Sequence, residues 1–270
     1  MEFGILGPLY VTDDSGSPAT PTAPKPRKVL ALLLLEANKM VPTETLVREL
    51  WEDVPPRSAL STLQTYIFQI RRFLHASQPA GRPHDRLVTT PLGYMLKIRP
   101  GELDLHSFEA DMLESKSAIR RGEHEAASAL LRRGLALWRG TAFCDVRTGP
   151  LLEIGALQLT ERWLAAQQLR ISVDLLLGRH MELVGELTGL TAQHPHHETL
   201  HSQLMLTLHL SGRRSEALEA FTRLRDELVN ELGIEPSSTI RHMHDLILRG
   251  DASLSEGRQP PEYLAALGIS

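Results

Sequence analysis

The hydrophobic pattern of the chain changes near residue 100, and that change limits the folds that it can adopt. Before that point, short apolar runs alternate with segments rich in Gly and Pro, which is typical of strands, turns and short helices. From Asp104 onward the apolar residues recur almost throughout at helical spacing. The sequence therefore predicts a mixed first domain over residues 1–100, an all-helical domain over 101–254 and a C-terminal tail over 255–270.

The first domain contains its elements in a recognisable order. The stretch EFGILGPLYV predicts two strands around Gly7. Three helices follow: RKVLALLLLEAN, ending at Asn38; ETLVRELW, capped by Thr43; and ALSTLQTYIFQIRRFLH, capped by Ser58. The segment RLVTTPLGYMLKI predicts two closing strands around Pro91. Strands, three helices and a closing hairpin in this order predict a winged helix-turn-helix.

The helical part contains three similar stretches, RGEHEAASAL, LGRHMELVGEL and SGRRSEALEAF. Each is a glycine turn followed by the start of a helix. Gly178 and Gly212 are 34 residues apart, which matches the period of tetratricopeptide repeats, whereas Gly122 and Gly178 are 56 apart. The predicted fold class is therefore mainly α with a small β component: an N-terminal winged helix-turn-helix followed by a tetratricopeptide-like all-α helical domain.

The third predicted helix has two distinct faces. Its apolar stripe, which we expect to face the core, consists of Leu60, Leu63, Ile67, Ile70 and Leu74. The opposite stripe carries hydroxyl, amide and guanidinium groups and no carboxylate; it consists of Ser58, Thr62, Thr65, Gln69 and Arg72, with Ser61 and Tyr66 beside it.

Helical spacing alone leaves two interpretations of this polar stripe open. It is either an ordinary solvated surface or the recognition face of a helix that enters the major groove of DNA. In a major groove, Gln pairs with adenine, Arg with guanine, and the Thr methyl contacts thymine. Arg57 and Arg71 would then be placed to contact backbone phosphates, which position a protein without reading sequence.

The distribution of charge favours the second interpretation. The net charge of the whole chain is −4. The first hundred residues nevertheless carry twelve Lys and Arg against nine Asp and Glu, while the remainder carries seventeen against twenty-four. Such asymmetry predicts a first domain that faces a polyanion and a second domain that is acidic.

Several other classes of protein are disfavoured. The single cysteine, Cys144, allows no internal disulfide and suits a reducing cytosol. The start, MEFGILGPLY, lacks the basic region of a signal peptide, and no stretch approaches 18 uncharged apolar residues. We therefore expect a soluble intracellular protein that has no contact with membranes.

Four segments together resemble the Streptomyces antibiotic regulatory protein family. They are RSALSTLQTYIFQIRRFL, LVTTPLGYML, ALLRRGLALWRG and HSQLMLTLHLSGRRSEALEAFTRLRDELVNELGIEP, and the similarity runs from about Phe3 to Leu254. The resemblance implies an OmpR-type winged-helix DNA-binding domain followed by a bacterial transcriptional activation domain. It also implies the small form of the family, since the chain contains no Gly-Lys pair and hence no Walker A motif.

The resemblance implies a function as well. Such proteins activate antibiotic or other secondary-metabolite gene clusters by binding direct repeats in promoter DNA and recruiting the bacterial RNA polymerase holoenzyme. The resemblance implies a head-to-tail dimer on DNA, a cytoplasmic location, no enzymatic activity and no cofactor. An alternative from another class is a tetratricopeptide-type adaptor whose first domain binds protein rather than DNA.

Residues that contact DNA in the family carry over by position. In the recognition helix they are Ser61, Thr62, Thr65, Tyr66, Gln69 and Arg72, and in the wing they are Thr89, Thr90 and Tyr94. Basic residues near these positions complete the candidate set: Arg27, Lys28, Arg57 and Arg71. The wing is shorter than the OmpR pattern and has no arginine at its tip.

A zinc-protease pattern, H-E-x-x-H, occurs at His197 to His201. On a helix it would pair two imidazoles with Glu198 as general base. The extended metzincin pattern also requires a glycine and a third histidine, where this chain has Leu204 and Thr207. The resemblance places the stretch at the start of a repeat helix, so the sequence predicts neither a metal site nor a protease.

Overall fold

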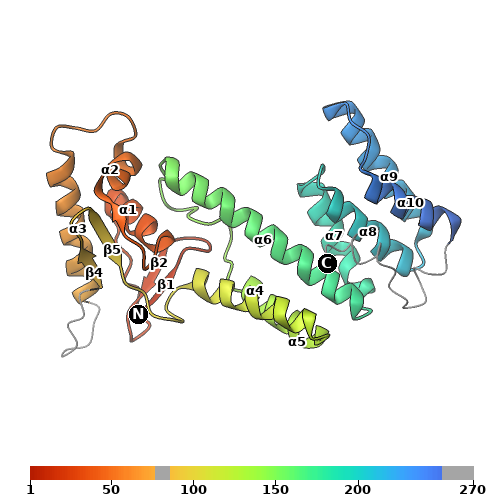
Figure 1. Ribbon diagram of the computed structural model, residues 1–270, viewed down its shortest axis with the longest axis horizontal. Coiled ribbons are helices and arrows are strands. Elements are labelled where there is room, and N and C mark those ends of the chain that lie inside the picture. The colour runs from red at the N-terminus through yellow and green to blue at the C-terminus, as the bar shows by residue number, and fades with distance from the viewer. Residues whose placement is uncertain (77–85, 251–270) are drawn as a thin grey trace. The chain divides into compact units, whose positions relative to one another are not determined.

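The computed structural model describes residues 1–76 and 86–250 (Figure 1). These residues form two compact units. The first contains Met1–Leu113 and Arg133–Leu164, and the second contains Glu114–Arg132 and the described residues from 165 to 250. The first unit thus includes segments that lie beyond the sequence-based boundary at residue 100. The predicted tail, 255–270, lies outside the described residues.

The winged helix-turn-helix is confirmed in the first unit. Its elements are β1 (Glu2–Gly4), β2 (Tyr10–Thr12), α1 (Pro24–Leu35), β3 (Val41–Pro42), α2 (Thr43–Trp51), α3 (Ala59–Ala76), β4 (Leu87–Thr89) and β5 (Gly93–Leu96). The strands β1 and β2 pair antiparallel, and a second antiparallel sheet has the order β3-β5-β4. Thr43 is the first residue of α2, not its cap, and Pro42 precedes it.

The core of this unit follows from the apolar faces of α1 and α3. The side chains of α1 from Val29 to Leu34 are all at most 2% exposed, as are Leu63, Ile67, Ile70 and Leu74 on α3. Leu60 is 61% exposed, so its predicted place in the core is wrong. It lies in the first turn of α3, at the edge of the apolar stripe.

A buried carboxylate on α2 fastens a distant segment to the winged helix. Glu49 is 1% exposed. Its carboxylate accepts hydrogen bonds from the backbone N–H groups of Gly149 (2.7 Å), Leu151 (2.8 Å) and Leu152 (3.4 Å). These donors lie at the N-terminus of α6 (Pro150–Leu176), where the first backbone N–H groups of a helix have no partner within the helix. Glu49 supplies that partner.

Two aspartates that follow residue 100 make similar links to the start of the chain. Asp104, at the start of α4 (Asp104–Arg120), accepts the N–H groups of Ile5 and Leu6 and pairs with the Arg139 guanidinium at 3.0 Å. Asp145 accepts the Leu9 N–H at 2.7 Å and pairs with Arg27. The first compact unit therefore extends past residue 100 because its buried backbone donors find their acceptors there.

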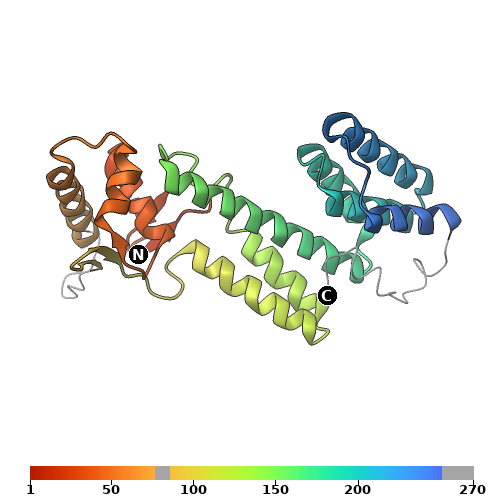
Figure 2. The same ribbon diagram turned by 45° about the horizontal axis from the view of Figure 1, so that its top comes forward.

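The described residues of the second unit form helices joined by turns and short loops, without a strand among them (Figure 2). After α5 (His124–Leu135) and α6 come α7 (His180–Gln193), α8 (Glu198–Leu210), α9 (Arg214–Glu227), a π-helical turn (Leu228–Leu232) and α10 (Ser238–Arg249). Gly122, Gly178 and Gly212 adopt left-handed conformations with φ of 74° to 76°.

Each of these three glycines closes its helix by the same pair of hydrogen bonds. The glycine N–H donates to the carbonyl three residues earlier, and the next N–H donates to the carbonyl five residues earlier. This is the Schellman motif. The three similar stretches are therefore three helical hairpins, and the interval of 56 residues arises because α6 is 27 residues long and follows a loop.

The H-E-x-x-H stretch lies at the start of α8. His197 occupies the N-cap position, and the amide nitrogen of Gln168 lies 2.9 Å from its Nε2. His201 is 6% exposed, and burial lowers its pKa to about 4. Among residues 1–76 and 86–250, no three His, Cys, Asp or Glu side chains are grouped so as to hold a metal ion.

No helix in the described part of the chain combines the length and the apolar character needed to cross a bilayer.

Replacing Glu49 with alanine should lower the free energy of unfolding by about 2–4 kcal/mol, because two buried N–H groups and one half-buried N–H group lose their acceptor. Urea denaturation of the full chain would measure this. The matched control is Asp53→Ala, which removes an exposed carboxylate two residues after α2 and should change stability by less than about 0.5 kcal/mol. Equal effects of the two substitutions would contradict the anchoring role.

His201 should make stability depend on pH. Its pKa in the folded protein is about 4, against about 6.5 in an unfolded chain, so between these values only the unfolded state takes up the proton. The free energy of unfolding should then fall by about 2 kcal/mol as the pH drops from 7 to 5. His201→Gln should lose this contribution in urea titrations at several pH values. An unchanged slope in the variant would refute the assignment.

Candidate nucleic-acid interface

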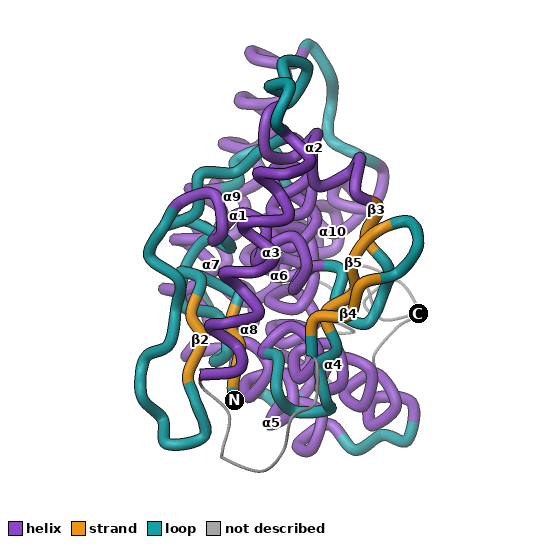
Figure 3. Tube along the Cα trace, turned by 90° about the vertical axis from the view of Figure 1, so that its left-hand side faces the viewer, coloured by secondary structure: helices purple, strands orange, loops and turns teal. Residues whose placement is uncertain are grey.

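The exposed face of α3 carries six side chains that point away from the core. Figure 3 views the winged helix with α3 in front, the β3-β5-β4 sheet on one side and β1-β2 on the other. The exposed residues on this face of the helix are Ser61, Gln64, Thr65, Phe68, Gln69 and Arg72. None of them is acidic. Thr62 and Tyr66, also predicted to contact DNA, are half-buried at the edge of this face.

Two hydroxyl groups on this face are already bonded to the helix. The Ser61 Oγ donates to the Ser58 carbonyl, and the Thr65 Oγ1 donates to the Ser61 carbonyl, both at 3.0 Å. Such bonds occupy the donor of each hydroxyl. The Thr65 methyl and the oxygen lone pairs remain available, which suits contact with a thymine methyl group or an amino group in a major groove.

Arg71 holds the wing against α3. Its Nε donates to the Leu87 carbonyl at 3.0 Å, and its Nη2 donates to the Thr89 Oγ1 at 2.6 Å. Both acceptors lie on β4. Arg71 and Thr89 were predicted as separate DNA contacts, and the structure instead brings them together as partners. Their contribution is to fix the position of the wing relative to the helix.

The wing turn is tightly closed. The N–H of Thr90 donates to the Gly93 carbonyl at 2.9 Å, and the Leu92 carbonyl accepts the N–H of Thr43, which begins α2. A Cβ at Gly93 would lie 2.0 Å from the Val41 carbonyl oxygen, so only glycine fits there. Leu92 at the tip is 70% exposed, and it occupies the place where a basic residue would enter a minor groove.

Three predicted contacts need correction. Lys28 is 8% exposed, and its Nζ donates to the Glu49 carbonyl at 3.2 Å. Arg27 pairs with Asp145 and also donates to the Pro21 carbonyl. Tyr94 is 8% exposed on β5. Lys28 and Tyr94 are buried and Arg27 is bound internally, so we no longer assign these three residues to the DNA surface.

The sequence-based selection also missed two residues. Gln64 and Phe68 lie on the exposed face of α3, and Phe68 is 63% exposed. At 100° per residue, Phe68 falls between Ser61 and Gln64 around the helix and about 120° from the centre of the apolar stripe. The spacing therefore contained this information, although the apolar character of phenylalanine pointed to the core.

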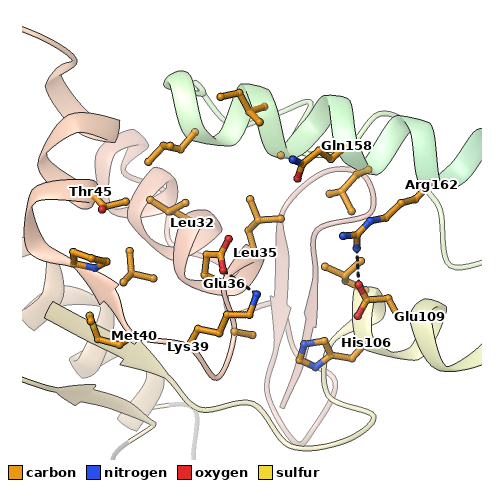
Figure 4. Close-up of a pocket in the computed structure, with 18 residues that line it drawn as sticks. Leu32, Leu35, Glu36, Lys39, Met40, Thr45, His106, Glu109, Gln158 and Arg162 are labelled. Atoms are coloured by element: carbon orange, nitrogen blue, oxygen red, sulfur yellow. Dashed lines mark hydrogen bonds and ion pairs between the residues drawn. The ribbon is translucent and has the colours of Figure 1, made fainter.

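A separate cleft of about 570 Å³ lies in the same unit (Figure 4). It is lined by α1, α2, α4 and α6, with Leu32 and Leu35 on one wall. The charged groups at its rim are paired with each other: Glu36 with Lys39 at 3.2 Å, and Glu109 with Arg162 at 2.5 Å. This cleft lies toward the C-terminal end of α1, and its charged side chains are paired with each other. It is therefore not part of the α3 face.

Substitutions on the α3 face should separate base reading from phosphate binding. Gln69→Ala or Arg72→Ala should reduce discrimination at one base pair by about 1–3 kcal/mol. Arg57→Ala, just before α3, should weaken binding to all sequences and reduce the slope of log affinity against log salt by about one. Titrations of selected and scrambled duplexes would measure both. If all three variants affected every duplex equally, the assigned face would be wrong.

Two family models match the chain in sequence order. The transcriptional regulatory protein C-terminal domain matches residues 18–96, and the bacterial transcriptional activator domain matches residues 103–248. The regulatory protein DnrI of Streptomyces peucetius is 45% identical over 273 residues, which cover all of this chain and 99% of DnrI.

A longer relative aligns with this chain across both matched segments. The transcriptional regulatory protein EmbR of Mycobacterium tuberculosis is 36% identical over 92% of this chain and 63% of its own length. The structure of EmbR in complex with a low-affinity phosphopeptide matches 99% of this chain and 69% of that chain, with a TM-score of 0.90 and 33% identity. With both domains in this order and a relative at 45% identity over its length, the chain belongs to the Streptomyces antibiotic regulatory protein family of transcriptional regulators.

Proposed function

We propose that this regulator is a sequence-specific transcriptional activator that reads promoter DNA with α3. The observation that carries the proposal is the exposed face of α3, which presents Ser61, Thr65, Gln69 and Arg72 and contains no carboxylate. The carboxylates that an ordinary solvated helix face carries among its charges would repel a polyanion, and this face has no carboxylate.

The chemistry of the face suits direct readout of bases. Gln69 can form paired hydrogen bonds with adenine, and Arg72 can do so with guanine. Thr65 and Phe68 offer apolar groups for thymine methyls. Arg57 is exposed and makes no ion pair among the described residues, so its guanidinium is available for a backbone phosphate.

The arrangement on DNA follows from the family. Two protomers bind direct repeats head-to-tail, so each presents a different surface to the contact between them. Adjacent recognition helices then lie about one helical turn apart, roughly 10–10.5 bp. Each protomer thereby meets the duplex in the same orientation.

The helical unit supplies activation by recruiting the RNA polymerase holoenzyme. Helical-hairpin arrays stack into extended surfaces that bind protein, and the described residues contain three glycine-closed helical hairpins. The target is an antibiotic or other secondary-metabolite gene cluster, as the family relationship implies. The protein acts in the cytoplasm, where promoter DNA and polymerase are found.

Moving one repeat tests the proposed arrangement. With two repeats one turn apart, the full chain should bind cooperatively, and affinity should fall steeply between about 50 and 200 mM salt. An insertion of about half a turn puts the second protomer on the opposite face, so cooperativity should collapse while single-site binding survives. Mobility-shift titrations measure both quantities.

Two outcomes would contradict the proposal in different ways. Equal cooperativity at zero and half-turn insertions would remove the paired arrangement and leave DNA binding intact. Failure of the chain to bind any duplex from a random pool, at low salt, would instead favour the adaptor function. Run-off transcription with purified polymerase on the same templates would test activation directly.

A further inference from the structure

Arg147 lies in the loop before α6, within the segment that matches the activator domain. Its side chain is exposed, and it makes no ion pair or hydrogen bond with the described residues. We propose that Arg147 contacts a backbone phosphate of the bound DNA, so that the activator-domain segment contributes directly to the DNA interface. This inference rests on the proposed function.

The position of Arg147 supports this assignment. Together with Thr148 it lines a hollow of about 580 Å³ whose other walls include Tyr66 and Gln69 of the recognition helix. The N-terminal turn of α1 completes the hollow with Lys25, whose Nζ lies 5.0 Å from the centre of the Trp51 ring. A duplex read by Gln69 would therefore carry its nearest strand past Arg147.

The charges around this hollow favour a phosphate. Lys25, Lys28 and Arg147 contribute three cations, and Glu52 contributes the one carboxylate among the lining residues. The Lys28 ammonium is already bonded to the Glu49 carbonyl, which leaves Lys25 and Arg147 as the groups that can turn outward. A phosphate at this position would meet a net positive field.

The loop holds Arg147 in a defined place. Two residues before it, Asp145 is bonded to the Leu9 N–H and paired with Arg27. Two residues after it, the Gly149 N–H donates to the Glu49 carboxylate at 2.7 Å. Both partners belong to the winged helix, so ordering of the loop costs little when DNA binds, which is the advantage of preorganisation. Arg27, which sequence reasoning assigned to DNA, instead anchors the loop that carries Arg147.

The test compares salt dependence in the full chain. Arg147→Gln should reduce the slope of log affinity against log salt by about one, and Arg147→Lys should restore most of it, because the contact depends on charge. The matched control is Arg162→Gln, which removes one positive charge near the other end of α1, where Arg162 pairs with Glu109. The control should keep the wild-type slope, and base preference should be unchanged in all three variants.

Neutral methylphosphonate linkages, placed one at a time along the site, would locate the contact. At one linkage, the neutral substitution should lower the affinity of the wild-type protein about threefold to fourfold. The same substitution should leave the affinity of Arg147→Gln unchanged, because that variant has already lost the contact. An unchanged slope for Arg147→Gln, or losses that simply add at every linkage, would overturn the inference while leaving DNA binding established. Absence of salt-dependent binding by the wild type would instead overturn the proposed function. Thermal unfolding of each variant would confirm that the fold is intact.

Discussion

The carboxylate of Glu49 is the interaction on which the first compact unit depends. The Glu49 side chain, on α2, is 1% exposed and accepts hydrogen bonds from three backbone N–H groups at the N-terminus of α6. A buried carboxylate is costly unless it is fully hydrogen-bonded, and a helix N-terminus provides both donors and a favourable dipole. The consequence is that the helix-turn-helix and the first part of the activator segment form one unit, although they match separate family models.

Internal pairing decides which basic residues can face DNA. The first domain carries an excess of cations, but several of them are used within the fold. Arg27 binds Asp145, Lys28 binds the Glu49 carbonyl, and Arg71 binds the wing. Arg86 pairs with Glu102 at 2.6 Å and 2.8 Å, which holds the pKa of that carboxyl group below its usual value despite its partial burial. The excess of positive charge in the first domain is therefore a poor guide to its DNA-binding surface. The few cations that remain unpaired on the surface are a better guide.

The helical unit also contains paired charges, and here they lie in its interior. Asp174 is completely buried on α6 and accepts hydrogen bonds from Arg132, Arg170 and Arg179, with Ser128 completing its shell. These donors come from α5, from α6 itself and from the turn that precedes α7. Removing one member of such a group leaves an uncompensated charge. The network thus fixes the register of neighbouring hairpins, whereas their apolar faces alone would allow small displacements.

Local pattern was sufficient to predict the order of the helices, the first two strands and the closing hairpin, the three glycine-closed hairpins and most of the α3 face. It did not predict the two-residue strand β3 (Val41–Pro42), because that strand is defined by its pairing with β5. Each of these depends on neighbours within a few residues: alternation in strands, 100° spacing in helices, and glycine where φ must be positive. The family followed from the same stretches, because long motifs specify a fold as well as local elements.

Local pattern failed wherever a partner was distant in sequence. Arg27 and Lys28 look like surface cations until Asp145 and Glu49 are brought to them. Arg147 has no local feature that connects it with Gln69, and only the fold brings both residues to the same hollow. Sequence alone determined which elements form and which helix face is polar. The tertiary structure decided which charges remain free to meet DNA, because burial and pairing depend on contacts between residues about a hundred positions apart.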